Sequence, residues 1–143
     1  REIWADLDST MMSQALTNLI KNAGEAIETY KEKNLEMNMV PQVRIMLSAS
    51  KDTAKITIAD NGIGLPEDRA KLFEPYVTTR EKGTGLGLPI VKKIIDEHGG
   101  TLILTDAPAF DDTGSNNTGR YGAMAVIHLP IQAALTLPQT ETA

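Results

Sequence analysis

The sequence predicts an α/β protein of the α+β two-layer sandwich type, with three helices on one face of a mixed five-stranded sheet. Three observations lead to this prediction. Several short segments alternate apolar and polar residues, as half-buried strands do. Two longer segments repeat apolar residues with the period of a helix that covers a sheet. Two glycine-rich runs lie at the ends of these segments, where the backbone must turn sharply.

The composition bounds the possible functions. At 143 residues the chain is long enough for one domain with a real core, expected over 1–132, followed by a disordered tail at 133–143. A net charge of −5 argues against a nucleic-acid partner. The absence of cysteine excludes a disulfide framework and a thiolate metal site. The chain opens inside a strand-like run, so we expect it to be cut from a longer protein.

The elements follow one another with clear boundary signals. A cap at Asp8–Thr10 precedes the first helix, and Gly99-Gly100 ends the last one. The turn at 51–53 predicts an antiparallel hairpin between the strands on either side. The expected elements are a strand near 2–6, a helix at 11–33, strands near 43–49 and 55–60, helices at 67–72 and 87–98, and strands near 101–105 and 123–129.

The first helix has two chemically different faces. An apolar stripe is expected to pack on the sheet: Met12, Leu16, Leu19, Ile20, Ala23, Ile27 and Tyr30. Asn18, Asn22 and Glu25 follow a helical spacing on the other side. A solvated face is one interpretation of this pattern. However, asparagine is a mediocre helix former, so two of them one turn apart suggest a functional face.

The first glycine-rich run, Asp60-Asn61-Gly62-Ile63-Gly64, follows directly on a predicted strand. A carboxylate there can accept a hydrogen bond from an amino group such as that of adenine. The glycines suit positive φ or a close approach of the backbone to a ligand. An ordinary turn is the alternative interpretation, because Asp-Asn-Gly is a common turn sequence.

The second glycine-rich run, 83–89, opens the last helix after a polar loop at 73–82. Glycines before a helix N-terminus leave backbone N–H groups available and let a phosphate approach closely. The run lacks the Gly-Lys-Ser/Thr ending of a Walker motif. It also follows a loop, whereas the Rossmann fingerprint follows a strand.

These motifs, in this order over about 9–130, resemble the ATP-binding domain shared by gyrase, Hsp90, MutL and histidine kinases, which has the Bergerat-type fold. The resemblance is closest to the catalytic domain of bacterial sensor histidine kinases. Residues 18–23 are similar to their N box, 60–64 to the first glycine box, 72–76 to the F box and 83–88 to the second glycine box. The segment 22–26 and the short lid are similar to the nitrogen-regulation kinases of the NtrY and NtrB type.

The resemblance implies a role for each motif. Asn22 would offer its side-chain oxygen to Mg²⁺, a hard cation that also takes phosphate and water oxygens. Asp60 would accept the adenine amino proton, and Thr79 and Arg80 on the lid would reach the phosphates. The implied nucleotide-binding set is Asn18, Asn22, Asp60, Gly62, Ile63, Gly64, Thr79, Arg80, Gly83, Gly85, Leu86 and Gly87.

Asn18 distinguishes a kinase from an ATPase within this resemblance. In the gyrase and Hsp90 branches a glutamate that activates water stands one turn before the Mg²⁺ asparagine. Here that position is an amide, which cannot act as a general base. We therefore expect slow hydrolysis and a catalytic set of Asn18, Asn22 and Arg80. Glu25, on the same face, is interpreted as structural or as a bystander near the phosphates.

The resemblance also implies the partners of the chain. The phosphate acceptor would be a histidine on a separate dimerisation domain, and a response regulator would act downstream. His98 and His128 are expected to be structural, so the chain should bind ATP and Mg²⁺ without phosphorylating itself. We expect a monomeric cytoplasmic domain without direct membrane contact, in a parent often anchored in the inner membrane. The alternatives are an anti-sigma-type serine kinase and a non-catalytic nucleotide sensor.

Overall fold

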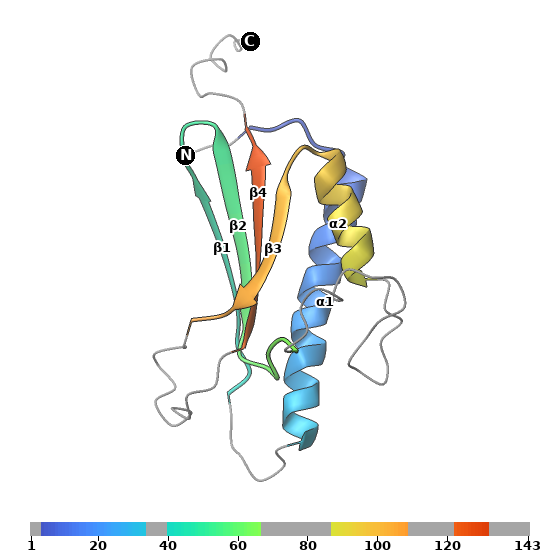
Figure 1. Ribbon diagram of the computed structural model, residues 1–143, viewed down its shortest axis with the longest axis vertical. Coiled ribbons are helices and arrows are strands. Elements are labelled where there is room, and N and C mark those ends of the chain that lie inside the picture. The colour runs from blue at the N-terminus through green and yellow to red at the C-terminus, as the bar shows by residue number, and fades with distance from the viewer. Residues whose placement is uncertain (1–3, 34–39, 67–86, 109–121, 132–143) are drawn as a thin grey trace.

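The computed structural model describes residues 4–33, 40–66, 87–108 and 122–131. In this part of the chain, two helices pack on one face of a four-stranded sheet (Figure 1). The elements are α1 (Ser9–Lys33), β1 (Val43–Ala49), β2 (Thr53–Asp60), α2 (Gly87–Glu97), β3 (Thr101–Asp106) and β4 (Ala123–Pro130). Neither of these helices is long and apolar enough to cross a membrane.

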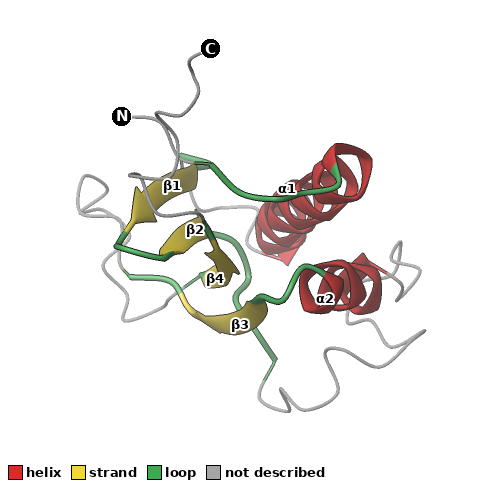
Figure 2. Cartoon of the chain, turned by 90° about the horizontal axis from the view of Figure 1, so that it is seen from above, coloured by secondary structure: helices red, strands yellow, loops and turns green. Residues whose placement is uncertain are grey.

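The strands lie in the order β1-β2-β4-β3, and each neighbouring pair is antiparallel. Seen from above, both helices lie on the same side of the sheet (Figure 2). The predicted hairpin is confirmed: β1 and β2 pair from Val43↔Asp60 to Ala49↔Ala54. Ser50 N donates to Thr53 O at 2.8 Å and closes its turn.

Two parts of the fold prediction need correction, and two others lie outside the described residues. The prediction of a mixed sheet is wrong for the described strands, because every pairing among them is antiparallel. The expected strand near 2–6 is not seen at 4–6, since an alternating pattern forms a strand only where another edge supplies hydrogen bonds. The expected helix at 67–72 and the tail at 133–143 lie outside the described residues.

The ends of the helices follow from local chemistry. Asp8 caps α1: its Oδ1 accepts from Met11 N at 3.0 Å, and its carbonyl accepts from Met12 N at 2.9 Å. At the end of α2, Gly99 N donates to Asp96 O and Gly100 N to Ile95 O, both at 3.0 Å. This is the Schellman arrangement, and Gly99 takes the positive φ of 74° that it requires.

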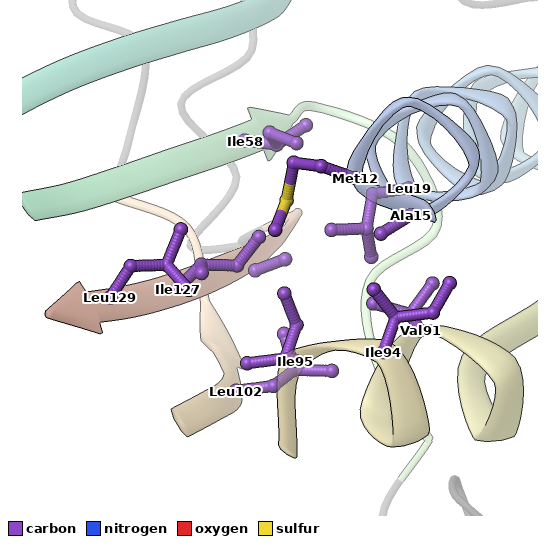
Figure 3. Close-up of a cluster of buried hydrophobic side chains, with 11 residues drawn as sticks. Met12, Ala15, Leu19, Ile58, Val91, Ile94, Ile95, Leu102, Ile127 and Leu129 are labelled. Carbon is purple, nitrogen blue, oxygen red and sulfur yellow. The ribbon is translucent and has the colours of Figure 1, made fainter. Parts of the chain in front are cut away.

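The main core lies between the two helices and the sheet (Figure 3). Methionine, alanine and leucine side chains of α1 meet isoleucine and valine side chains of α2 above the strands. Ile20 was predicted to be in the apolar stripe, but it is 43% exposed on the flank of α1. The buried residues of this cluster are Met12, Ala15, Leu19, Ile58, Val91, Ile94, Ile95, Leu102, Ala125, Ile127 and Leu129.

Candidate functional site

The turn after β2 holds a buried carboxylate. Asp60 is the last residue of β2 and is only 4% exposed. Its Oδ1 accepts a hydrogen bond from Gly62 N at 2.8 Å and a longer one from Ala123 N at 3.4 Å. Backbone donors from the turn and from β4 therefore fix the direction of this carboxylate, which is what recognition of a flat ligand requires.

The turn is attached to the backbone of α1 (Figure 1). Ile63 N donates to Ala26 O at 3.0 Å. A Cβ added at Gly62 would lie 2.4 Å from the backbone carbon of Ala26, so only glycine allows this close approach. Gly64 takes a φ of 86°, which side chains rarely adopt. The predicted need for glycine is thus met by close contact with a helix at Gly62 and by positive φ at Gly64, and the nucleotide-binding role of both stays a prediction.

Asn22 of α1 lies beside the start of α2. Asn18 and Asn22 are both half-buried on α1. A Cβ built on Gly87, the first residue of α2, would lie 3.6 Å from Oδ1 and 3.8 Å from Nδ2 of Asn22. The first N–H groups of a helix have no partner within it and carry its positive dipole end. The Asn22 amide thus lies at a helix end suited to an anion.

α1 brings the predicted parts of the site together. Asn22 and Ala26 are one helical turn apart, so they lie on the same side of α1. Ala26 supports the Asp60 turn, whereas Asn22 adjoins the start of α2. The structure therefore places the expected base-binding residues and the start of the expected phosphate-binding helix within about a turn of each other along α1.

Several predicted site residues cannot be placed in this arrangement. Thr79, Arg80, Gly83, Gly85 and Leu86 lie outside the described residues, as do the residues similar to the F box. Glu25 is half-buried on α1, and its role stays a prediction. In the described part of the chain, no group of three or more His, Cys, Asp or Glu side chains could hold a metal ion.

The sequence analysis did not predict a role for two residues at the site, Gly122 and Asn61. Gly122 precedes β4, and a Cβ there would lie 1.9 Å from Asp60 O, so β4 starts directly against the carboxylate-bearing residue. The sequence showed only a glycine at the end of a polar loop. Asn61 is 8% exposed, and its side chain binds the backbone of residues 40–42. Its burial could not be predicted from the sequence, because Asp-Asn-Gly also forms exposed turns.

Comparison with known proteins agrees with this geometry. The model of the family described as "Histidine kinase-, DNA gyrase B-, and HSP90-like ATPase" matches residues 7–133. The nitrogen regulation protein NtrY of Azorhizobium caulinodans is 54% identical over 107 residues, which cover 73% of this chain and 13% of that protein. The sensory histidine kinase/phosphatase NtrB of Rhodobacter capsulatus is 36% identical over 105 residues, covering 71% of this chain and 30% of that protein.

Solved structures show the same fold. The catalytic domain of histidine kinase ThkA superposes with a TM-score of 0.64 at 30% identity, covering 88% of this chain and 71% of that one. The mycobacterial sensor histidine kinase MprB gives a TM-score of 0.68 at 26% identity, with 88% and 74% covered. The chain spans less than a third of the length of the NtrY and NtrB relatives. It belongs to the family of histidine kinase-, DNA gyrase B- and HSP90-like ATPases.

Proposed function

We propose that this chain is the ATP-binding, phosphoryl-donating domain of a two-component sensor histidine kinase of the NtrY/NtrB type. The observation that carries the proposal is the meeting of three features at α1: the buried Asp60 carboxylate, the Asn22 amide and the N-terminus of α2. A carboxylate suits an adenine amino group, whereas an amide oxygen and a helix N-terminus suit Mg²⁺ and phosphates. The names of the relatives support the same activity.

At the base end, Asp60 would accept a hydrogen bond from the adenine amino group. The backbone donors on its Oδ1 hold the carboxylate in one direction. Gly62, Ile63 and Gly64 would lie against the ring, since Gly62 and Ile63 are held on α1. A site that orients one acceptor in this way discriminates adenine from a base with a carbonyl at that position.

At the phosphate end, Asn22 and the first turn of α2 would share the charge of the triphosphate. A single neutral oxygen ligand binds Mg²⁺ weakly, so metal and nucleotide should bind together. The amide of Asn22 fits this role, because it lies at the start of α2, where phosphate oxygens would complete the shell. Bound Mg²⁺ would neutralise part of the phosphate charge. Thr79, Arg80, Gly83, Gly85, Leu86 and Gly87 would bind the phosphates.

The reaction would be transfer of the γ-phosphoryl group to a histidine of a separate dimerisation domain. The histidine nitrogen forms a bond to the γ-phosphorus while the bond to the ADP oxygen breaks, which requires positioning more than covalent chemistry from this domain. Asn18 would leave water unactivated, because an amide cannot accept its proton. A response regulator would then take the phosphoryl group, and the parent protein would hold this domain in the cytoplasm, behind a membrane anchor.

Calorimetric titration tests nucleotide binding directly. We expect the chain to bind ADP and a non-hydrolysable ATP analogue with micromolar dissociation constants, and Mg²⁺ to strengthen binding of the ATP analogue. Asp60→Ala should weaken binding roughly 10- to 100-fold, because it removes a hydrogen bond to a charged group worth about 1.5–3 kcal/mol. A folded wild-type chain that binds neither nucleotide would contradict the proposal. Unchanged affinity in a folded Asp60→Ala variant would contradict the adenine assignment alone.

The acceptor is tested by adding the dimerisation domain of an NtrY-type kinase to the chain with labelled ATP. We expect label on that domain and none on this chain. The new phosphorus–nitrogen bond should be lost in acid and stable in alkali. A label that survives acid would indicate a serine acceptor and would contradict the histidine kinase assignment.

A further inference from the structure

Asn61 joins the Asp60 turn to the end of the β1–β2 ladder. The last regular pair of that ladder is Val43↔Asp60. The next pair would be Gln42 with Asn61. Its first hydrogen bond is an ordinary backbone bond, from Asn61 N to Gln42 O at 3.3 Å. The ladder therefore continues one step beyond Asp60, to the point where the chain must leave the sheet.

The second bond of this pair is made by a side chain. In an antiparallel ladder, two residues of a hydrogen-bonded pair exchange two backbone bonds. Here Gln42 N donates at 3.0 Å to Oδ1 of Asn61. The same amide donates from Nδ2 to Val40 O at 2.8 Å. The side chain of Asn61 thus acts as an extra peptide group, and the main chain is able to turn away from the sheet.

The turn that begins at Asn61 carries the base-binding residues. Gly62 N binds the Asp60 carboxylate at 2.8 Å, and Ile63 N reaches α1 through Ala26 O at 3.0 Å. One end of this turn is therefore held by α1, and the other by the Asn61 amide. The two contacts of the Asn61 side chain require an acceptor and a donor on separate atoms, which among side chains of this size only the asparagine amide supplies.

We propose that Asn61 is a positioning residue of the nucleotide site: its amide fixes the turn in which Asp60 and Gly62 meet the adenine. This inference rests on the proposed function. Asn61 acts through the backbone of its two neighbours, so its removal should loosen the turn and weaken base recognition while the sheet stays folded. A purely structural role would lower stability and leave the affinity of the folded protein unchanged.

The test compares Asn61→Asp with wild type. The carboxylate keeps the shape of the amide but cannot donate to Val40 O. We expect ADP to bind about tenfold more weakly, and the preference for ADP over GDP to shrink. In the ligand-free protein, hydrogen exchange of the Gly62 and Ile63 amides should accelerate about tenfold, while the β2–β4 amides stay unchanged. Asn61→Ala replaces this variant if the new charge prevents folding.

Val40→Ala is the matched control. Val40 contributes its carbonyl to the Asn61 contact, and its side chain is 62% exposed. This variant should behave as wild type in all three measurements. A folded Asn61 variant with unchanged ADP affinity would overturn the inference, even if exchange at Gly62 accelerates. Failure of the proposed function is distinguishable, because the wild-type chain would then bind no ADP, and that result would overturn this inference as well.

Discussion

Gly62 and Gly64 show that two glycines of one motif can be required for different physical reasons. At Gly62 there is no room, since a Cβ would meet the backbone of Ala26 and Ile27 at 2.4–2.6 Å. At Gly64 the reason is conformational, because its φ is 86°. Gly24, on the exposed side of α1, does not have to be glycine for either reason, since nothing lies within 4 Å of a Cβ there. The turn therefore tolerates no side chain at two positions, whereas the helix tolerates one.

Two substitutions to alanine should consequently change the free energy of unfolding in opposite directions. Gly62→Ala should lower the free energy of unfolding by about 1–3 kcal/mol and weaken ADP binding, because the turn must move off α1. Gly24→Ala, its control, should raise the free energy by about 0.5–1 kcal/mol, because glycine is a poor helix former. Urea unfolding measures both. A Gly62→Ala variant as stable as wild type would show that α1 and the turn do not need their close contact.

Asn18 offers a second test at the scale of one side chain. It is half-buried on α1, one turn before Asn22. Asn18→Glu would place a carboxylate where water could be activated, so we expect ATP hydrolysis to rise, by at most the roughly 10²- to 10⁴-fold of general-base catalysis. A coupled assay of ADP release measures this, and Asn18→Gln should show no rise. If Asn18→Glu binds ATP without faster hydrolysis, the amide is not what keeps hydrolysis slow.

At the scale of elements, His98 links the start of α1 to the end of α2. Its Nε2 accepts from Asp8 N at 3.0 Å, and its Nδ1 lies 2.8 Å from Ile94 O. A carbonyl can only accept, so Nδ1 is the donor in this contact. The expectation of a structural role agrees with this contact, which ties together residues 90 positions apart in the sequence.

Removal of this link should destabilise the helix pair without removing the site. His98→Ala should lower the free energy of unfolding by about 0.5–1.5 kcal/mol, because Asp8 N loses its acceptor. Lys92→Ala, on the same helix, removes an exposed ion pair with Asp96 and should change stability by only a few tenths of a kcal/mol. Thermal or urea unfolding compares the two. Equal effects would mean that the His98 contact contributes no more than a surface pair.

At the scale of the whole molecule, the helices cover the sheet unevenly. β1 is an edge strand of the described sheet, and α1 packs chiefly over β2 (Figure 2). The register places Val43, Ile45 and Leu47 on the helix-facing side of β1, yet they are 40%, 54% and 60% exposed. Ile58, paired with Ile45 on the next strand, is 4% exposed. Apolar side chains beside a strand edge favour association between chains.

The expected monomer should therefore self-associate through β1 only when the chain is raised to high concentration. Leu47→Lys should raise the concentration at which association begins and change the free energy of unfolding by less than about 0.5 kcal/mol, because the side chain is already exposed. Sedimentation or light scattering measures the association. Ile58→Lys is the contrasting variant and should not fold, because it buries a charge. Unchanged association in Leu47→Lys would show that β1 is not the contact.

Most elements of the described part of the chain could be predicted from the sequence, because hydrophobic period, caps and glycines act locally. The strand at 43–49 and the helix beginning near Gly87 lie as expected, and Asp60 ends its strand as expected. Three contacts could not be predicted: Gly62 packs on α1, Gly122 lies against Asp60, and His98 accepts from Asp8 N. These contacts join residues far apart along the chain. They depend on which backbones the packed layers bring together, and no local pattern carries that information.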